Sequence, residues 1–257
     1  MKIVVCVKQV PATDSRIHPA ADGKSVDLSG VEWIVNPYDE IALEAALQLQ
    51  EKHGGEVVAV SIGGGKVEEA MRTTLALGVD RAVVLKDPSF PGDPGNVSAA
   101  LAAMVQREEP DLVLCGKQAV DDDRMAVPAM LAERLDLPQA TVVVKLEVAE
   151  DGKSATVLRE VEGGHEEIAI SFPAVLATQK GLNEPRYASL KGIMKAKKKP
   201  VDVVTAADLG LETVPAAAEI LEVVQPSQER KGRMIEGDAK TQAAELVRIL
   251  REEEKVL

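Results

Sequence analysis

The first 150 residues alternate between short valine-rich runs and stretches with helical periodicity. The valine-rich runs have the composition of strands buried on both faces of a sheet, at residues 2–7, 56–62, 82–85 and 111–115. Between them, apolar residues recur at helical spacing, at residues 37–53, 67–77, 96–109 and about 125–135. Strands that alternate with helices over short connections predict an α/β fold with right-handed crossovers.

Local signals mark several ends of these helices. Asn36 followed by Pro37 is typical of an N-cap and a first helical residue. Gly78 lies where the second helix is expected to end, and Pro110 follows the third. These residues predict where three of the four helices begin or end.

Composition supports the same architecture. Only 2% of the 257 residues are aromatic although 46% are hydrophobic, so the core must consist of Val, Leu, Ile and Ala. Such side chains suit a parallel sheet covered by helices. The few aromatic side chains and the formal net charge of -12 also argue against nucleic acid as the main partner.

Cysteine usage and hydropathy indicate the compartment. Cys6 and Cys115 lie far apart in strand-like runs, and we expect small buried hydrophobes rather than a zinc site or a disulfide. No apolar run approaches the roughly 20 residues of a membrane span, and the N-terminus starts a strand instead of a signal peptide. We therefore expect a soluble, cytoplasmic protein that is not integral to a membrane.

After residue 135 the periodicity changes to alternation. Antiparallel strands joined by turns at Gly152 and Gly163 are predicted, and one more strand follows them. The predicted strands are residues 141–148, 155–160, 166–170 and 173–178.

Beyond Pro200 the composition is that of an extended arm. Residues 206–219 are rich in Ala, and residues 225–237 are polar with Pro and Gly. A helix at about 239–253 ends the chain, with one apolar face formed by Ala243, Leu246, Val247 and Leu250. A helix on such an arm needs a surface to cover, either its own sheet or a partner subunit.

The predicted fold is a doubly wound, mostly parallel sheet with helices on both faces, an antiparallel extension, and a C-terminal arm plus helix. Residues 1–211 would form the α/β nucleotide-binding domain. Residues 212–257 would form the arm and its helix.

Candidate ligand-binding residues gather at the carboxyl ends of the predicted parallel strands. Lys8, Gly63 and Gly116 follow three of these strands, and the helix start at Asn36 lies alongside. The glycine-rich residues 63–66 lack P-loop spacing and are a weak signal. Residues 116–124 are a stronger one, because a donor-rich loop leads into three aspartates near a helix start.

Neither the three aspartates nor the three histidines indicate a metal or catalytic site. Consecutive side chains diverge, so Asp121, Asp122 and Asp123 do not readily face one ion, and helix capping or ribose hydrogen bonding is expected. No nucleophile motif accompanies the histidines, which are expected to be solvated: His18, His53 and His165. The sequence therefore predicts a site that holds a nucleotide without transforming it.

A basic segment interrupts the acidic chain between residues 183 and 200. Six basic side chains and no acid lie between Arg186 and Lys199, interleaved with apolar and aromatic groups. The basic side chains are Arg186, Lys191, Lys195, Lys197, Lys198 and Lys199. A docking surface, a phosphate site and a solvated helix end are all compatible with this pattern.

Three ordered motifs resemble the β (small) subunits of the electron-transfer flavoprotein family. They are Asn36-Pro37-Tyr38-Asp39-Glu40-Ile41-Ala42, Gly116-Lys117-Gln118-Ala119-Val120-Asp121-Asp122-Asp123, and Leu182 to Leu190 continued by residues 193–199. The resemblance runs from Lys2 to about Leu211, with the arm and last helix also in place.

The resemblance implies an electron carrier without catalytic residues of its own. Such a chain pairs with a larger α subunit that holds most of an FAD site, and the arm and helix would pack on that subunit. The heterodimer takes electrons from dehydrogenases such as acyl-CoA dehydrogenases and passes them to a downstream quinone-linked oxidoreductase. On the side of this chain, residues 10–16 offer Thr13 and Arg16 toward the flavin.

The family also implies a structural AMP and a recognition loop. The implied AMP site comprises Cys6, Asn36, Pro37, Tyr38, Asp39, Ile62, Gly116, Lys117, Gln118, Ala119, Val120, Asp121, Asp122, Asp123, Arg124, Met125, Ala126 and Val127. In the loop after Asn183, Leu190 would anchor the dehydrogenase, with Tyr187, Ile193, Met194 and Lys195 around it.

One departure from the family lies just after the aspartates. Many members have a Thr and then a Gln there, where this chain has Arg124, Met125 and Ala126. We expect Arg124 to hold the phosphate instead. Three alternatives stay open: a second FAD in place of AMP, as in the bifurcating branch; a stand-alone nucleotide-binding or nucleotide-hydrolysing α/β protein; and a nucleic-acid role for residues 195–199.

Overall fold

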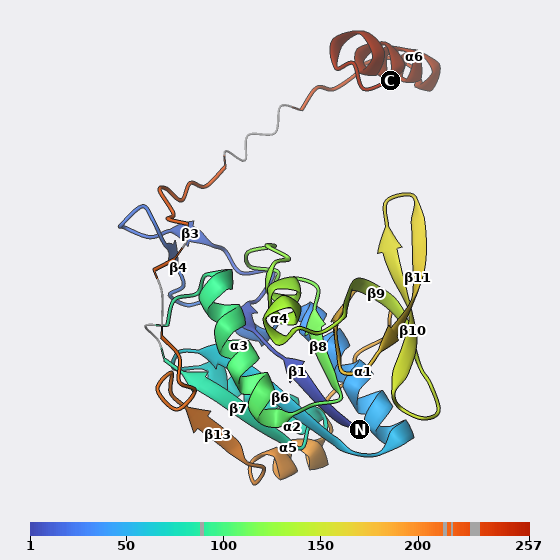
Figure 1. The fold of residues 1–257 in the computed structure, drawn as a ribbon. Helices are drawn as coiled ribbons and strands as arrows, with labels where there is room; N and C mark the ends of the chain where they lie inside the picture. The colour runs from blue at the N-terminus through green and yellow to red at the C-terminus, as the bar shows by residue number, and fades with distance from the viewer. Residues whose placement is uncertain (88–89, 213–214, 217, 227–231) are drawn as a thin grey trace.

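The computed structural model describes residues 1–257 except residues 88–89, 213–214, 217 and 227–231. Its centre is a nine-stranded sheet with the order β11-β10-β9-β12-β8-β1-β6-β7-β13 (Figure 1). The strands are β1 (Lys2–Cys6), β6 (Glu56–Gly63), β7 (Arg81–Lys86), β8 (Leu112–Gly116), β9 (Gln139–Val148), β10 (Ser154–Val161), β11 (Gly164–Ser171), β12 (Ala174–Thr178) and β13 (Val201–Val204).

The strand order of the parallel part of the sheet has its topological switch point at β1. From β1 the chain adds β6 and β7 on one side, and then crosses to β8 on the other. In register, Val5 of β1 faces Ala59 of β6 and Leu114 of β8. The two strands that flank the switch therefore end beside β1, which is where open α/β sheets bind ligands.

Helices cover both faces of the sheet (Figure 1). One face carries α1 (Pro37–His53), α2 (Val67–Leu77) and α5 (Leu190–Ala196), and the other carries α3 (Pro94–Glu108) and α4 (Val127–Leu135). Alternate residues of β1 enter two separate cores: Ile3 and Val5 face α1 and α2, whereas Val4 faces α3 and α4. The predicted doubly wound α/β class, with its antiparallel extension, is confirmed.

The helix boundaries follow local chemistry. The bounds predicted for α1 and α2 agree with the structure to the residue. The start predicted for α3 is two residues late, because Asp93 caps the helix by accepting from Gly95 N at 3.0 Å and Asn96 N at 3.3 Å, with Pro94 as the first helical residue. The start predicted for α4 is two residues early, since residues 125 and 126 precede the helix.

Several short strands lack a sequence signal strong enough to predict them. They are β13 and two small ribbons, in which β2 (Gln9–Pro11) pairs with β5 (Trp33–Val35) and β3 (His18–Pro19) with β4 (Val26–Asp27). The prediction for β9 is also incomplete. Its first residues pair in parallel with β12, and only its later part pairs antiparallel with β10.

The C-terminal helix lies away from the sheet (Figure 1). It consists of α6 (Ala239–Arg248) and a π-helical turn, η1 (Ile249–Glu253), where one continuous helix is predicted. No residue of either is buried, and on the predicted apolar face Ala243, Leu246 and Val247 are exposed while Leu250 is half-buried. The arm contacts the β3–β4 ribbon through Lys24 Nζ and Glu219 Oε1 at 2.9 Å and through Val223 N and Gly23 O at 2.9 Å.

Parts of the predicted arm lie outside the described residues, namely 213–214, 217 and 227–231. Within the described parts of the chain, no helix has the length and apolar character needed to cross a membrane.

Candidate functional site

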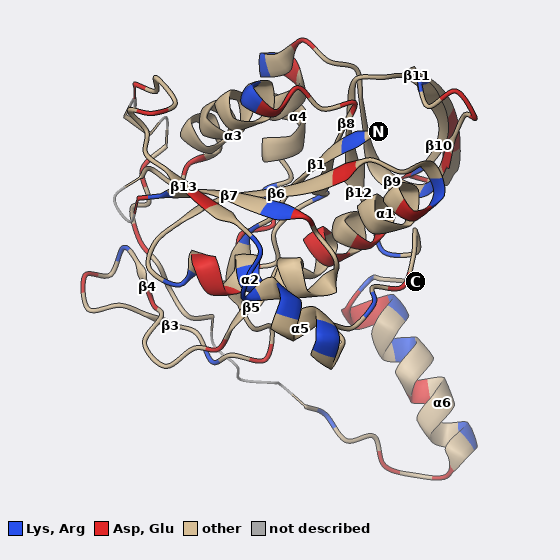
Figure 2. Cartoon of the chain, turned by 90° about the horizontal axis from the view of Figure 1, so that it is seen from below, with Lys and Arg blue, Asp and Glu red and all other residues tan. Residues whose placement is uncertain are grey.

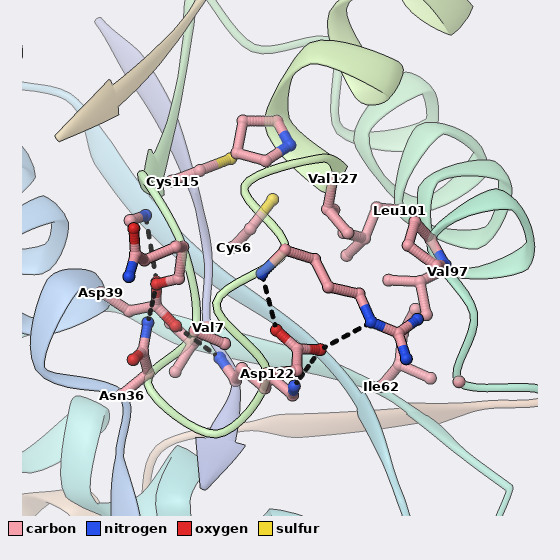
Figure 3. Close-up of a pocket in the computed structure, with 18 of the residues that line it drawn as sticks. Cys6, Val7, Asn36, Asp39, Ile62, Val97, Leu101, Cys115, Asp122 and Val127 are labelled. Carbon is pink, nitrogen blue, oxygen red and sulfur yellow. Dashed lines mark hydrogen bonds and ion pairs between the residues drawn. The ribbon is translucent and has the colours of Figure 1, made fainter. Parts of the chain in front are cut away.

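A cavity of about 410 Å³ opens at the carboxyl ends of β1, β6, β7 and β8 (Figure 3). Its walls come from the strand ends, the loop before α4, and the first turns of α3 and α4. A volume of this size is at the lower end of the range for small-molecule sites, roughly 300–1,000 Å³.

Most of the predicted nucleotide-site residues line this cavity. They are Cys6, Asn36, Asp39, Ile62, Gly116, Gln118, Ala119, Asp122, Arg124, Met125, Ala126 and Val127. Six others do not: Pro37, Tyr38, Lys117, Val120, Asp121 and Asp123. The structure therefore brings together residues from four segments that are distant in sequence, and their role in nucleotide binding stays a prediction.

The sequence did not lead us to predict the far wall of the cavity. It consists mainly of apolar residues at the start of α3 and the loop before it, including Phe90, Val97 and Leu101. The further lining residues are Val7, Lys8, Gly63, Gly64, Asp87, Gly92, Pro94, Cys115 and Pro128. The Asp93-Pro94 helix start is a signal that could have placed this wall, because it sets the first turn of α3 at the same sheet edge.

Asn36 is the N-cap residue of α1, and its side chain links this helix start to the loop after β8. Its side chain makes no capping hydrogen bond. Instead, Asn36 Nδ2 donates to Gln118 O at 2.9 Å, and Asn36 Oδ1 accepts from Val120 N at 3.2 Å. The predicted N-cap position of Asn36, with Pro37 as the first helical residue, is therefore confirmed, but the buried amide satisfies the backbone of the loop after β8 instead of capping the helix.

Asp39 is a buried carboxyl group that links α1 to two strand ends. It accepts from Lys8 N at 2.7 Å and from Gly116 N at 3.0 Å. Burial raises the pKa of Asp39 to about 7, against the opposing effect of these N–H groups and of Asn36. The group is thus one whose protonation changes near neutral pH.

Gly116 permits this close approach. A Cβ at this position would lie 2.7 Å from Tyr38 Cβ and would also collide with the carboxylate of Asp39. Only glycine lets the end of β8 pass this close to the first turn of α1.

The aspartate triplet forms ion pairs rather than a helix cap. Lys8 Nζ donates to Asp121 at 2.7 Å and to Asp122 at 3.2 Å, and Asp122 also lies 3.8 Å from Arg124 Nε (Figure 3). Asp123 accepts from the Gln118 side chain. Of the two roles predicted for the aspartates, helix capping is wrong, since α4 begins only after Ala126 and without a side-chain cap, and ribose hydrogen bonding stays a prediction.

Cys6 and Cys115 are buried side by side at the floor of the cavity (Figure 3). They follow Val5 and Leu114, which are register partners on β1 and β8. The hydrogen bond to Cys6, together with burial, raises the pKa of the Cys115 thiol well above its usual range. Both cysteines are free and buried, as the sequence predicts.

No metal centre is visible among the described residues. In that part of the chain, no three His, Cys, Asp or Glu side chains are grouped as they would be around a metal ion. His18 and His165 are exposed. His53 is half-buried, and its Nε2 is buried without a hydrogen-bond partner, so the expectation of a solvated ring holds only in part.

The basic segment divides into structural and exposed cations. Arg186 donates through Nε to Glu44 at 2.7 Å and through Nη1 to Glu51 at 2.6 Å. Burial alone would raise the pKa of Glu44, but hydrogen bonds from Arg186 and Gln48 outweigh it and hold that pKa below its usual value. Arg186 therefore fixes the segment to α1.

Lys199 fixes the other end of the segment. Its Nζ donates to Gly78 O at 2.9 Å and to Leu75 O at 3.3 Å, which are carbonyl groups at the end of α2. Desolvation lowers its pKa. Arg186 and Lys199 are thus parts of the fold, and the exposed cations are Lys191, Lys195, Lys197 and Lys198. Figure 2 shows the basic positions on α5 in blue.

An exposed apolar group accompanies these lysines. Tyr187 is 97% exposed and Leu190 is 84% exposed, beside the exposed Ile193 and Met194. The short helix α5, which carries Leu190, Ile193 and Met194, packs on α2 at Gly192, where a Cβ would collide with Ala76 O. The segment therefore presents large apolar side chains from a fixed support.

Known proteins are similar to this chain over its whole length. The family described as electron transfer flavoprotein domain matches residues 24–209. The chain is 41% identical to the electron transfer flavoprotein subunit beta of Bacillus subtilis and 42% identical to that of Bradyrhizobium diazoefficiens, with 100% of each chain covered. The mitochondrial subunit beta of Arabidopsis thaliana is 41% identical over 91% of this chain and 93% of its own length. The chain therefore belongs to the electron transfer flavoprotein family, among its β subunits.

Proposed function

We propose that this chain is the β subunit of a heterodimeric carrier that takes electrons from dehydrogenases and passes them to a quinone-linked acceptor. The observation that carries the proposal is the match to curated β subunits over the full length. An α subunit would hold most of the FAD, whose isoalloxazine ring accepts and releases the electrons. From this chain, Thr13 and Arg16 are exposed and would approach the flavin.

In this proposal the cavity holds AMP. The side chains of Asn36 and Gln118 are polar groups at one end of the cavity, the apolar wall of α3 lies at the other, and Lys8 and Arg124 supply positive charge. This donor set fits a small nucleotide, with Arg124 near the phosphate. A cavity of about 410 Å³ favours AMP over a second, much larger FAD.

The exposed apolar segment then serves as the dehydrogenase dock. Leu190 would enter a pocket of the partner, and Tyr187, Ile193, Met194 and Lys195 would surround it. Burial of one Leu contributes roughly 1.5–3 kcal/mol, whereas the exposed lysines mainly raise the encounter rate with an acidic partner.

Co-expression with a candidate α subunit tests the proposal. We expect a yellow 1:1 complex, and mass spectrometry of the denatured complex should find one FAD and one AMP. Two FAD per complex would support the bifurcating type. A colourless monomer that hydrolyses ATP would reject the carrier in favour of a stand-alone nucleotide enzyme, and one that shifts nucleic acid would reject it in favour of a nucleic-acid-binding protein.

The variant Arg124→Ala tests the phosphate assignment in the same assay. We expect AMP to be lost from the purified complex while FAD remains, because without the guanidinium the Asp122 carboxylate faces the phosphate uncompensated and repels it. Lys117→Ala is the matched control, because Lys117 belongs to the same loop but lies over the Tyr38 ring, 5.2 Å from its centroid, and does not line the cavity.

A further inference from the structure

One carboxylate lies among the two cations that line the cavity. Asp122 accepts from Lys8 Nζ at 3.2 Å and lies 3.8 Å from Arg124 Nε. The Asp122 side chain also accepts from Arg124 N at 3.4 Å. Lys8, Arg124 and Asp122 all line the cavity, so an internal anion already occupies the place between the cations (Figure 3).

These contacts are weak enough to exchange. The three side chains are 33–44% exposed, and exposed ion pairs contribute only about 0.2–1 kcal/mol each. At 3.8 Å the Arg124–Asp122 pair is not a hydrogen bond, whereas a phosphate offers a guanidinium two parallel hydrogen bonds. A phosphate can therefore replace the carboxylate, but it must first overcome the existing pairs.

The loop keeps Asp122 in this place. Asp123 N donates to Ala119 O at 2.9 Å and closes the turn that carries Asp122. Asp123 itself has a φ of 49° and contacts Gln118 instead of the cations. Neighbouring aspartates of equal charge thus differ in what they contact.

From this arrangement we infer that Asp122 is a specificity-determining residue, which competes with the ligand's phosphate for Lys8 and Arg124. The inference rests on the proposed nucleotide-binding function and deepens it. Its consequence is a site that gains little affinity from a phosphate group. Adenosine and AMP should therefore bind the unaltered protein with similar affinities.

The test compares adenosine and AMP directly on the full chain in complex with its α subunit. The purified complex is exchanged into excess adenosine, desalted, and titrated with AMP, and the released adenosine gives the ratio of the two dissociation constants. Asp122→Asn should raise the affinity for AMP about five- to tenfold relative to adenosine, because one carboxylate no longer competes. Asp123→Asn removes the same charge from the same loop and should change the ratio less than about twofold.

A second variant separates competition from a general change in loop charge. In Asp122→Asn combined with Arg124→Ala, the gain in AMP affinity should largely disappear. An unchanged or lower AMP preference in Asp122→Asn, or an equal gain in Asp123→Asn, overturns the competition while leaving the nucleotide site intact. If neither adenosine nor AMP binds any variant, the proposed nucleotide function itself is overturned.

Discussion

Asp39 joins three parts of the chain that are distant in sequence. One carboxyl group accepts backbone N–H groups from the ends of β1 and β8 while its own residue lies in the first turn of α1. Loss of this carboxyl group leaves the buried N–H of Gly116 and the partly buried N–H of Lys8 without this acceptor, and a buried donor left without a partner costs about 1–3 kcal/mol. The cavity is therefore shaped by a polar group that also sustains the fold.

The raised pKa of Asp39 makes a prediction for the pH dependence of stability. Between about pH 4 and pH 7 the folded state retains a proton that the unfolded state has released, so this group's contribution to the free energy of unfolding falls as pH rises through that window. From pH 5 to pH 8, the free energy of unfolding of the wild type should fall by on the order of 2 kcal/mol relative to that of Asp39→Asn.

Urea unfolding at the two pH values measures this difference. Asp111→Asn is the control, since Asp111 also accepts a backbone N–H, from Lys2 at 2.7 Å, but at an exposed position. A gap between wild type and Asp39→Asn that is constant from pH 5 to pH 8 would contradict the prediction.

At the residue scale, sequence indicates which side chains gather but not what each one contacts. The strand-end rule places Asn36, Asp39 and Gly116 together because it depends only on topology. The contacts depend on tertiary geometry: Asn36 turns to the loop after β8, and Asp122 turns to Lys8. Local rules for caps could not anticipate either partner.

At the scale of elements, hydrogen bonds hold α5 and its flanking residues against α2. Ser189 caps α5 by accepting from Gly192 N at 3.0 Å, and Arg72 Nη1 donates to Ala196 O at 2.7 Å. The side chain of Leu190 is left exposed by this packing. The basic composition of the segment is visible in the sequence, but the structural use of Arg186 and Lys199 is not, because their partners lie more than 100 residues away.

Leu190→Ala should weaken electron transfer from the dehydrogenase without altering the fold. The KM for the dehydrogenase should rise about tenfold or more, since the removed side chain contributes roughly 1.5–3 kcal/mol to binding. Flavin content and melting temperature should stay unchanged. Leu28→Ala is the matched control, as another exposed Leu remote from α5 in the sequence. If Leu190→Ala leaves transfer from every dehydrogenase unaltered, the docking role is rejected.

At the scale of the whole molecule, the chain consists of a packed α/β body and a helix that does not pack on it. The alternation of strands and helices made the body predictable, because buried parallel strands and helices have distinct periodicities. The edge strand β13 was not predictable, since its four residues gain their structure only by pairing with β7.

Removal of residues 238–257 should leave the body stable and weaken the heterodimer. No residue of α6 is buried, so the melting temperature of the isolated chain should change little. The proposed apolar contacts of Leu246 and Val247 with the α subunit would be removed, and the dissociation constant of the complex should rise at least about tenfold.

Replacement of Leu246 and Val247 by Ser should reproduce the weakening, whereas replacement of Lys240 and Gln242 by Ser should not. An unchanged dissociation constant for the truncated chain would show that the helix does not serve the partner. A lower melting temperature of the isolated chain would instead show that α6 covers its own body.

The anchoring of the basic segment at Arg186 and Lys199 has a kinetic consequence. A loop that must become ordered on contact loses conformational entropy at each encounter, and this loss slows association and weakens the complex. Residues 187–198 are held at both ends by hydrogen bonds to the fold and contain the helix α5. Such a segment can form brief complexes in rapid succession, so that selectivity for a partner does not require a long residence time.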